Sequence, residues 1–337
     1  MKFRAYMKVL ALALLPLSGF LILAFRDPAA RSEKPGHLAR DSLLERPRGK
    51  GGDPTGRAGV DFVSLFSPVH QPPPCRPYQD LMVLVTSAPL HVDRRDAIRG
   101  SWARRRLSSP FSWQVVFLVG RATEQSAEAA VQEEQEIFGD LLLGDYVDTY
   151  RNLTLKVMHG LSWATSACRP SYVLKTDDDC FVNTDRLPGF LVRDNPIRTG
   201  LYTGSLFPAE RRDVIRDPGS KWYVSRQDYG RERYPPYASG VGYVLSLDAA
   251  RDLLAAATSI RPIPVEDAYV GILAEAAGIT PQDSGRFTKH NVSWRVCNYR
   301  YLMVIHQLSA QQQRLAHSKM VQAWTACPHS TDISNWD

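Results

Sequence analysis

The sequence predicts an α/β domain in which helices cover both faces of a central, mostly parallel sheet. From Tyr78 onward, short β-rich runs alternate with segments whose apolar residues recur at helical spacing, which is typical of strand–helix–strand units. The runs 81–85 and 115–119 are continuously apolar and have the length of buried strands. No GxGxxG or Walker-type loop follows an expected strand.

The other elements are predicted in chain order by the same periodicities. Apolar residues at helical spacing predict a helix over 123–138, with Thr123 available as its N-cap, and a second helix over 153–164. The second helix leads into a strand that ends at Asp177. Runs at 243–245 and 302–305 predict further strands, and Asp248 is placed to cap a helix that extends through Leu254.

The N-terminus predicts a membrane anchor. Residues 1–8 carry three cations, residues 9–25 form an uncharged and mainly apolar run, and Arg26 closes it. This pattern predicts a cytoplasmic tail over 1–8, a transmembrane signal anchor over 9–25 and a luminal remainder. The competing interpretation is a cleaved signal peptide, but no small-x-small site follows directly. The short span suits the thinner membranes of the secretory pathway, so we expect a single-pass type II protein of the Golgi membrane.

Residues 26–74 predict a disordered luminal stem. Eight Pro and six Gly fall among these 49 positions, and such a stretch buries too little apolar surface to offset the entropy of ordering it. The tail contributes three positive charges and the stem a net two, so only one charge of the net +6 belongs to residues 75–337. A nearly neutral domain gives no electrostatic reason to expect nucleic acid as a partner.

The cysteines predict an oxidising compartment. All five follow the expected membrane segment and none forms a CxxC pair, which favours disulfides over a zinc site. The odd number leaves at least one thiol free or paired between chains. Glycosylation sequons at Asn152 and Asn291 agree with a luminal location.

The triplet Asp177-Asp178-Asp179 is the main candidate site. It directly follows the apolar run 172–174, so three carboxylates are expected beyond the carboxyl end of a buried strand. Adjacent acids repel one another unless a cation compensates them, and hard oxygen ligands suit Mg²⁺ or Mn²⁺ carrying a diphosphate. The simpler alternative is a solvated turn. A calcium-binding surface protein is a further alternative, but EF-hand spacing is absent from the sequence.

Seven groups of residues occur in a recognisable order. They are Arg94-Arg95-Asp96-Ala97-Ile98-Arg99-Gly100-Ser101-Trp102, the run 116–120, the run 172–183 with the triplet, Lys221-Trp222-Tyr223, Tyr234-Pro235-Pro236-Tyr237-Ala238-Ser239-Gly240-Val241-Gly242-Tyr243, Glu266-Asp267-Ala268-Tyr269-Val270-Gly271, and Val304-Ile305-His306-Gln307. From about Cys75 to Cys327 the chain therefore resembles the β-1,3-glycosyltransferases of glycosyltransferase family 31. Three of these groups, at 234–243, 266–271 and 306–307, are most similar to the galactosyltransferase members.

The resemblance implies a fold and an activity. It implies one catalytic domain over 75–337 of the GT-A type, which binds a nucleotide sugar. The implied reaction is inverting transfer of a sugar, galactose above all, from a UDP-sugar to the 3-hydroxyl of an acceptor glycan in a β-1,3 linkage. N-Acetylglucosamine or N-acetylgalactosamine is the alternative donor sugar, and a non-catalytic luminal protein that binds glycan or UDP is the alternative of another class. The acceptor itself, on a glycoprotein, glycolipid or proteoglycan, is not specified.

The resemblance also implies roles for particular residues. Mn²⁺ is held by Asp179 and His306, while Asp177 and Asp178 face the nucleotide. An inverting transfer needs one general base. Asp267 is the candidate for that base, with Glu266 as the alternative. The purely structural alternative is that these two acids stabilise the N-terminus of a helix that follows Pro264.

Seven further residues are expected near the nucleotide sugar. Arg94, Arg95 and Arg99 offer guanidinium donors for uridine or phosphate, and Lys221 and Trp222 belong to one of the seven shared groups. Gly240 and Gly242 permit close approach of the backbone. Trp222 also has a ring face for a sugar, as do Tyr234, Tyr237 and Tyr243, although core packing explains these aromatic residues equally well.

A disulfide hypothesis completes the interpretation. Cys75 and Cys168 each precede a core strand, and Cys297 and Cys327 bracket the strand that leads to His306. Bridges 75–168 and 297–327 would each contribute about 3 to 4 kcal/mol by the chain-entropy model. Cys180 is then the odd thiol, buried beside the active site. It stands where relatives often carry an apolar residue.

Overall fold

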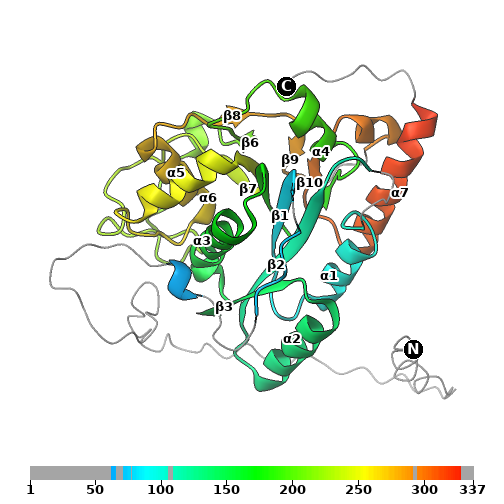
Figure 1. Ribbon diagram of the computed structural model, residues 1–337. Helices are drawn as coiled ribbons and strands as arrows, with labels where there is room; N and C mark the ends of the chain where they lie inside the picture. Colours follow the sequence, from blue (N-terminus) through cyan, green and yellow to red (C-terminus); the bar gives the residue numbers. More distant parts are fainter. Residues whose placement is uncertain (1–61, 66–70, 77, 105–108, 291–293, 328–337) are drawn as a thin grey trace, which may run out of the picture. The chain divides into compact units, whose positions relative to one another are not determined.

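A computed structural model describes residues 62–65, 71–76, 78–104, 109–290 and 294–327, all of which belong to one compact unit, Leu43–Asp337. Its centre is a seven-stranded sheet with the strand order β3-β2-β1-β4-β7-β6-β8 (Figure 1). The strands are β1 (Leu81–Thr86), β2 (Trp113–Arg121), β3 (Leu141–Val147), β4 (Tyr172–Asp177), β6 (Tyr202–Leu206), β7 (Ala238–Ser246) and β8 (Gln282–Asp283). Among these seven only β7 runs against the others, so the expected mostly parallel sheet is confirmed.

Helices cover both faces of this sheet, as expected. The helices are α1 (Val92–Arg99), α2 (Gln125–Phe138), α3 (Leu153–Trp163), the short α4 (Leu187–Gly189), α5 (Leu247–Ala257), α6 (Glu266–Ala276) and α7 (Ala310–Ala326). Alternate side chains of β1 enter two different cores because successive strand residues point to opposite faces. Met82 and Leu84 pack in the core that includes α3, α5 and α6. Val83 and Val85 pack in the core that includes α1, α2 and α7.

A second, three-stranded sheet lies after the carboxyl end of β4. It consists of β5 (Phe181–Val182), β10 (Val304–Ile305) and β9 (Phe287–Thr288), in the order β5-β10-β9. β10 pairs antiparallel with β5 and parallel with β9. This small sheet brings the residues that follow position 303 next to those that follow Asp179.

Some expected boundaries are corrected by the structure. The helix expected over 123–138 begins at Gln125, and its N-cap residue is Glu124, so Thr123 does not cap it. The strand expected at 302–305 contains only Val304 and Ile305. Asp248 lies in the first turn of α5 and accepts a hydrogen bond from the Gly200 N–H (2.8 Å), while Ser246 is the N-cap residue.

Part of the expected stem packs on the domain. Phe62–Leu65 forms a 3-10 helix that contacts α3 and β3, and the side chains of Phe62 and Leu65 are buried. The packed unit therefore begins before the expected boundary at Cys75, because two apolar residues one 3-10 turn apart reach the core. The tail at 1–8, the anchor at 9–25, and stem residues 26–61 and 66–70 lie outside the described residues. Across the described ranges, every helix is too short or too polar to span a bilayer.

The disulfide hypothesis is confirmed. Cys75 is bonded to Cys168 and Cys297 to Cys327, while Cys180 is a free and buried thiol. The first bridge holds the segment before β1 against the segment before β4. The second holds the end of α7 close to the small sheet.

Packing of α3 on the sheet yields a stability prediction. A Cβ atom at Gly160 would lie 2.6 Å from Leu118 Cδ1, and Leu118 is fully buried on β2. We expect Gly160→Ala to lower the free energy of unfolding by about 1–3 kcal/mol through overpacking, despite the better helix propensity of Ala. Chemical denaturation measures this change.

The matched control is Ser126→Ala on the exposed face of α2, which should change the free energy of unfolding by less than about 0.5 kcal/mol. Equal stability of Gly160→Ala and the wild type would contradict close packing of α3 on β2.

Candidate functional site

The aspartate triplet begins where β4 ends. Asp177 lies opposite Thr86, the last residue of β1, and accepts a hydrogen bond of 2.6 Å from the Thr86 hydroxyl. The Asp178 N–H donates to the Thr86 carbonyl (3.1 Å). The triplet therefore lies beyond the carboxyl ends of two adjacent parallel strands, where ligand sites of open α/β sheets occur.

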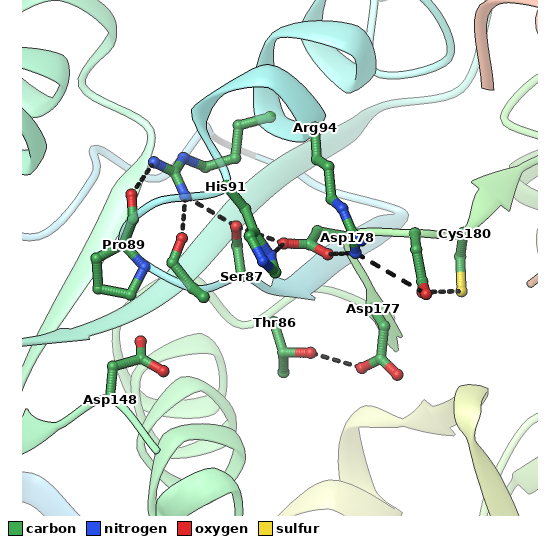
Figure 2. A network of polar contacts seen from close by, with 12 residues as sticks. Thr86, Ser87, Pro89, His91, Arg94, Asp148, Asp177, Asp178 and Cys180 are labelled. Carbon is green, nitrogen blue, oxygen red and sulfur yellow. Dashed lines mark hydrogen bonds and ion pairs between the residues drawn. The ribbon is translucent and has the colours of Figure 1, made fainter. Parts of the chain in front are cut away.

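Asp178 is buried and fully engaged with its own chain. Its carboxylate accepts hydrogen bonds from the Ser87 hydroxyl (2.8 Å) and Arg94 Nη1 (2.9 Å), and His91 Nδ1 lies 2.7 Å away (Figure 2). Burial alone would raise the pKa of Asp178, but these hydrogen bonds and the nearby positive charge lower it below its usual range. Asp178 therefore fixes the loop after β1 and the start of α1 beside the triplet.

Asp179 is the least compensated carboxylate of the three. The nearest basic groups to Asp179 are His306 Nε2 at 3.4 Å and Arg94 Nη1 at 3.9 Å. Burial raises the pKa of Asp179, and the charges of Asp177 and Asp178 raise it further, while His306 and Arg94 oppose the shift. Its side chain is 27% exposed, so a ligand can reach it.

His306 follows β10 and faces Asp179. Its Nδ1 lies 3.0 Å from the Lys289 carbonyl, which can only accept, so Nδ1 carries a hydrogen and Nε2 faces the carboxylate. When the ring is neutral, the Nε2 lone pair and the carboxylate oxygen point at the same space, which a cation stabilises. An oxygen and a nitrogen donor from separate elements therefore fit a divalent ion such as Mn²⁺.

Cys180 lies beside this pair. One ligand atom from each of Asp179, Cys180 and His306 falls within 4.8 Å of the others. The thiol, however, donates to the Val241 carbonyl (3.2 Å), and burial raises its pKa well above the usual value.

The backbone of the triplet is held by the C-terminal part of the chain. Gln313 Nε2 donates to the Asp178 carbonyl (2.7 Å), and the Leu308 N–H donates to the Asp179 carbonyl (2.9 Å). Gln313 is fully buried, and its Oε1 accepts from the Trp102 indole (3.0 Å). Gln307 has a φ of 63°, which turns the chain between His306 and α7. Helical spacing gave no signal for this role of Gln313.

Lys175 connects the triplet to the acids of α6. Its buried ammonium lies 2.8 Å from Asp177 Oδ1, 2.6 Å from the Gly240 carbonyl and 3.3 Å from Glu266 Oε2. Burial opposes the charge, but the carboxylates of Asp177 and Glu266 outweigh it and raise the pKa of Lys175 well above its usual value. A permanently charged ammonium therefore links β4, β7 and α6. The sequence gave no functional expectation for this lysine.

Glu266 and Asp267 form the first turn of α6 and differ in accessibility. Glu266 is 4% exposed, accepts from the Tyr243 hydroxyl (2.6 Å), and burial raises its pKa to about 7. Asp267 is partly exposed and accepts from the N–H groups of Gly240 (3.0 Å) and Ala268 (2.9 Å). Burial raises the pKa of Asp267 against these hydrogen bonds. The two acids therefore lie at the N-terminus of α6 and also form part of the candidate site.

The two glycines of β7 lie at close contacts. A Cβ atom on Gly240 would lie 3.4 Å from Lys175 Nζ and 3.5 Å from Asp267 Oδ2. At Gly242 it would lie 3.2 Å from Val304 Cγ1. Gly240 therefore leaves room for Lys175 and the acids of α6, while Gly242 allows β7 to pack against β10.

Lys221 and Trp222 lie on the Asp267 side of the site. Lys221 Nζ is 4.6 Å from the centroid of the Trp222 ring and 5.3 Å from that of Tyr150. Tyr150 lies near enough to Asp267 for the carboxylate to contribute to raising its pKa, after burial, to about 12. Tyr150 begins a short 3-10 helix after β3, and its place in this site had no signal in the sequence pattern. Tyr234, Tyr237 and Tyr243 are buried in the core.

Arg95 and Arg99 do not join the triplet. Arg95 is completely buried and donates to Glu134 (2.8 and 2.6 Å), Ser87 (2.9 Å) and two backbone carbonyls of the loop after β1. Arg99 pairs with Asp140 (2.7 Å) and Glu134 (2.7 Å). Their donors are engaged within the protein, and the guanidinium that faces the triplet is that of Arg94.

The chain belongs to the galactosyltransferase family, whose model matches residues 93–285. The resemblance to glycosyltransferase family 31 is thereby confirmed. Among curated relatives, β-1,3-galactosyltransferase 1 of Homo sapiens is 33% identical over 234 residues, which cover 69% of this chain and 71% of the relative. β-1,3-Galactosyltransferase 5 of Homo sapiens is 35% identical over 234 residues, covering 67% of this chain and 73% of the relative.

The similarity to solved structures is weaker than the similarity to these sequence relatives. Galactosyltransferase LgtC, solved with donor and acceptor sugar analogues, aligns with a TM-score of 0.33 and 10% identity over 74% of this chain and 98% of that chain. This degree of likeness carries no argument about the site. The family assignment therefore depends on the sequence relatives.

The raised pKa of Glu266 yields a prediction about stability and pH. Between the usual value of 4.5 and the folded-state value of about 7, the folded protein retains a proton that the unfolded chain has released. The free energy of unfolding therefore falls as pH rises through this window. The glutamine in Glu266→Gln cannot ionise. Across this pH window, we therefore expect the variant to lose on the order of 1–3 kcal/mol less unfolding free energy than the wild type loses.

Denaturant titrations at pH values from 4.5 to 7 measure this difference. Glu275→Gln is the matched control, because Glu275 lies on the same helix but is exposed. If Glu266→Gln and the wild type lose stability in parallel with rising pH, Glu266 is not the group that titrates.

Proposed function

We propose that this protein transfers galactose from UDP-galactose to the 3-hydroxyl of an acceptor glycan, with inversion, in a β-1,3 linkage. The observation that carries the proposal is the Lys175 ammonium, which contacts both Asp177 and Glu266 and so makes the triplet and the α6 acids border one site. Family membership implies a nucleotide-sugar donor and a glycan acceptor. The names of the relatives, both β-1,3-galactosyltransferases, support the donor and the linkage.

Asp179 and His306 are the proposed holders of Mn²⁺. Their facing donor atoms and the weak compensation of Asp179 favour this assignment. The ion supplies positive charge for the diphosphate that leaves. Asp177, beside Lys175 and Thr86, is proposed to face the nucleotide, and Asp178 to position the loop after β1.

Asp267 is the proposed general base. It is partly exposed, whereas Glu266 is enclosed and held by Tyr243 and Lys175. Two backbone N–H groups fix the orientation of the Asp267 carboxylate. Attack by the acceptor hydroxyl on the face opposite UDP releases a proton, and an oriented carboxylate within reach accepts it. Glu266 then acts as a positioning residue.

Arg95 and Arg99 receive indirect roles in this proposal. Arg95 holds the Ser87–Pro89 loop through its hydroxyl and carbonyl contacts, and Arg99 links α1 to Glu134 and Asp140. Of the three arginines expected at the nucleotide, Arg94 remains the proposed ligand contact, because its guanidinium lies beside Asp178 and Asp179. Lys221, Trp222 and Gly240 remain proposed ligand contacts.

The domain organisation and location are likewise proposed. Residues 1–8 form the cytoplasmic tail, 9–25 the signal anchor, and 26–61 the main part of the stem. The catalytic domain lies in the Golgi lumen, attached to the membrane by one helix. Two intramolecular disulfides in a folded domain support an oxidising compartment.

Metal binding is tested with Asp179→Ala. Loss of one of two protein ligands should lower Mn²⁺ affinity at least about tenfold and abolish transfer, while circular dichroism stays unchanged. Calorimetric titration of Mn²⁺ gives the affinity. Asp145→Ala, which removes an exposed carboxylate on β3, is the control and should bind Mn²⁺ like the wild type. Full transfer activity in excess chelator would refute the assignment.

The reaction itself is tested with donor and acceptor panels. The full chain is incubated with UDP-galactose, UDP-N-acetylglucosamine or UDP-N-acetylgalactosamine and an acceptor-glycan array, and linkage analysis of the product should give β-1,3-galactose. Asp267→Asn should reduce kcat by roughly 10²- to 10⁴-fold while UDP affinity stays close to that of the wild type, because only basicity is lost.

Two other outcomes are informative. If only Glu266→Gln shows this loss, the two acids exchange roles. Binding of UDP without transfer to any acceptor would instead identify a non-catalytic binding protein.

A further inference from the structure

Two exposed aromatic side chains meet beside the acids of α6. Tyr150 begins the 3-10 helix Tyr150–Asn152 that follows β3, and Trp222 lies in the connection between β6 and β7. They are 43% and 48% exposed, although large aromatic side chains are usually buried. Lys221 lies over both rings, which brings the three side chains into one cluster. Exposed rings arranged in this way offer flat apolar faces to a ligand.

The Tyr150 hydroxyl can donate a hydrogen bond to a ligand. The indole N–H of Trp222 lies near this hydroxyl and can only donate, so it does not compete for the phenol proton. Burial and the charge of Asp267 raise the pKa of Tyr150 to about 12, so this proton is retained at neutral pH.

The position of the phenol relates it to the proposed base. Asp267 and Glu266 both lie close enough to act on Tyr150 electrostatically. Tyr234 provides a second, independent observation. Its hydroxyl is buried and has no hydrogen-bond partner among the described residues, and it too is within electrostatic reach of Asp267 and Tyr150. A buried polar atom without a partner calls for an explanation, and a ligand hydroxyl beside Tyr234 would supply one.

We propose that Tyr150, which clusters with Trp222 and Lys221, donates a hydrogen bond to the acceptor glycan, and that the Trp222 ring packs against the face of the acceptor sugar. The ligand class is a pyranose with an apolar face and a hydroxyl next to the one that reacts. This inference rests on the proposed function and deepens it, because it places the acceptor on the Tyr150 side of Asp267. Selection of the acceptor then depends on Tyr150, which contacts neither the triplet nor His306 in the described structure.

Tyr150→Phe is the direct test, since it removes only the hydroxyl. The full chain is assayed with UDP-galactose and a panel of p-nitrophenyl β-glycosides of galactose, N-acetylglucosamine, N-acetylgalactosamine, glucose and xylose. The loss of one neutral hydrogen bond should raise KM for the acceptor by about 2- to 10-fold. KM for UDP-galactose and the affinity for UDP should stay within about twofold of the wild type.

Two further variants separate the parts of the cluster. Trp222→Phe keeps a ring face but removes the indole N–H, so its acceptor KM should rise less than that of Trp222→Ala. Tyr78→Phe is the control, because Tyr78 is 96% exposed and precedes β1 at the opposite end of the strand from the triplet. Its two KM values should equal those of the wild type.

The outcomes distinguish this inference from the proposed function. An active wild type whose acceptor KM is unaffected by Tyr150→Phe overturns the inference alone. Equal increases in KM for acceptor and donor also overturn it, because they indicate a general structural role. A wild type that binds UDP but transfers no sugar overturns the proposed function and this inference together.

Discussion

The buried ammonium of Lys175 is the interaction on which the arrangement of the site depends. Three partners, Asp177, the Gly240 carbonyl and Glu266, come from β4, β7 and α6, and they can approach one another only because a positive charge lies among them. Removing that charge would leave the buried Glu266 and the partly exposed Asp177 without their shared cation, which destabilises this arrangement. The same charge limits how far the triplet can move relative to the acids of α6.

The C-terminal segment makes a second connection of the same kind. It supplies His306 opposite Asp179 and holds the triplet backbone through Leu308 and Gln313. The Cys297–Cys327 bridge and the contacts of α7 with α1 keep this segment in place. The site is thus fixed from both faces of the sheet, by side-chain charge on one face and by backbone hydrogen bonds on the other.

The sequence predicted those features that depend on local pattern. Apolar runs located β1 and β2, and the position of the triplet after an apolar run located the site. Lys175 and Gln313 were missed because their roles depend on partners that tertiary packing brings together. Arg95 belongs to a motif, but its position on the inner side of α1 pairs it with Glu134, which helical periodicity did not associate with it. Charged residues with buried partners are the least visible from sequence.

The residues of the site are synthesised at very different times, and those of the C-terminal segment come last. The aspartates of the triplet emerge more than 120 residues before His306, Leu308 and Gln313, and Cys327 emerges last of the bonded cysteines. Until then the triplet lacks its partners from β10 and α7, and only the contacts of Asp177 and Asp178 with earlier residues can form. The site is therefore completed only after α7 has docked.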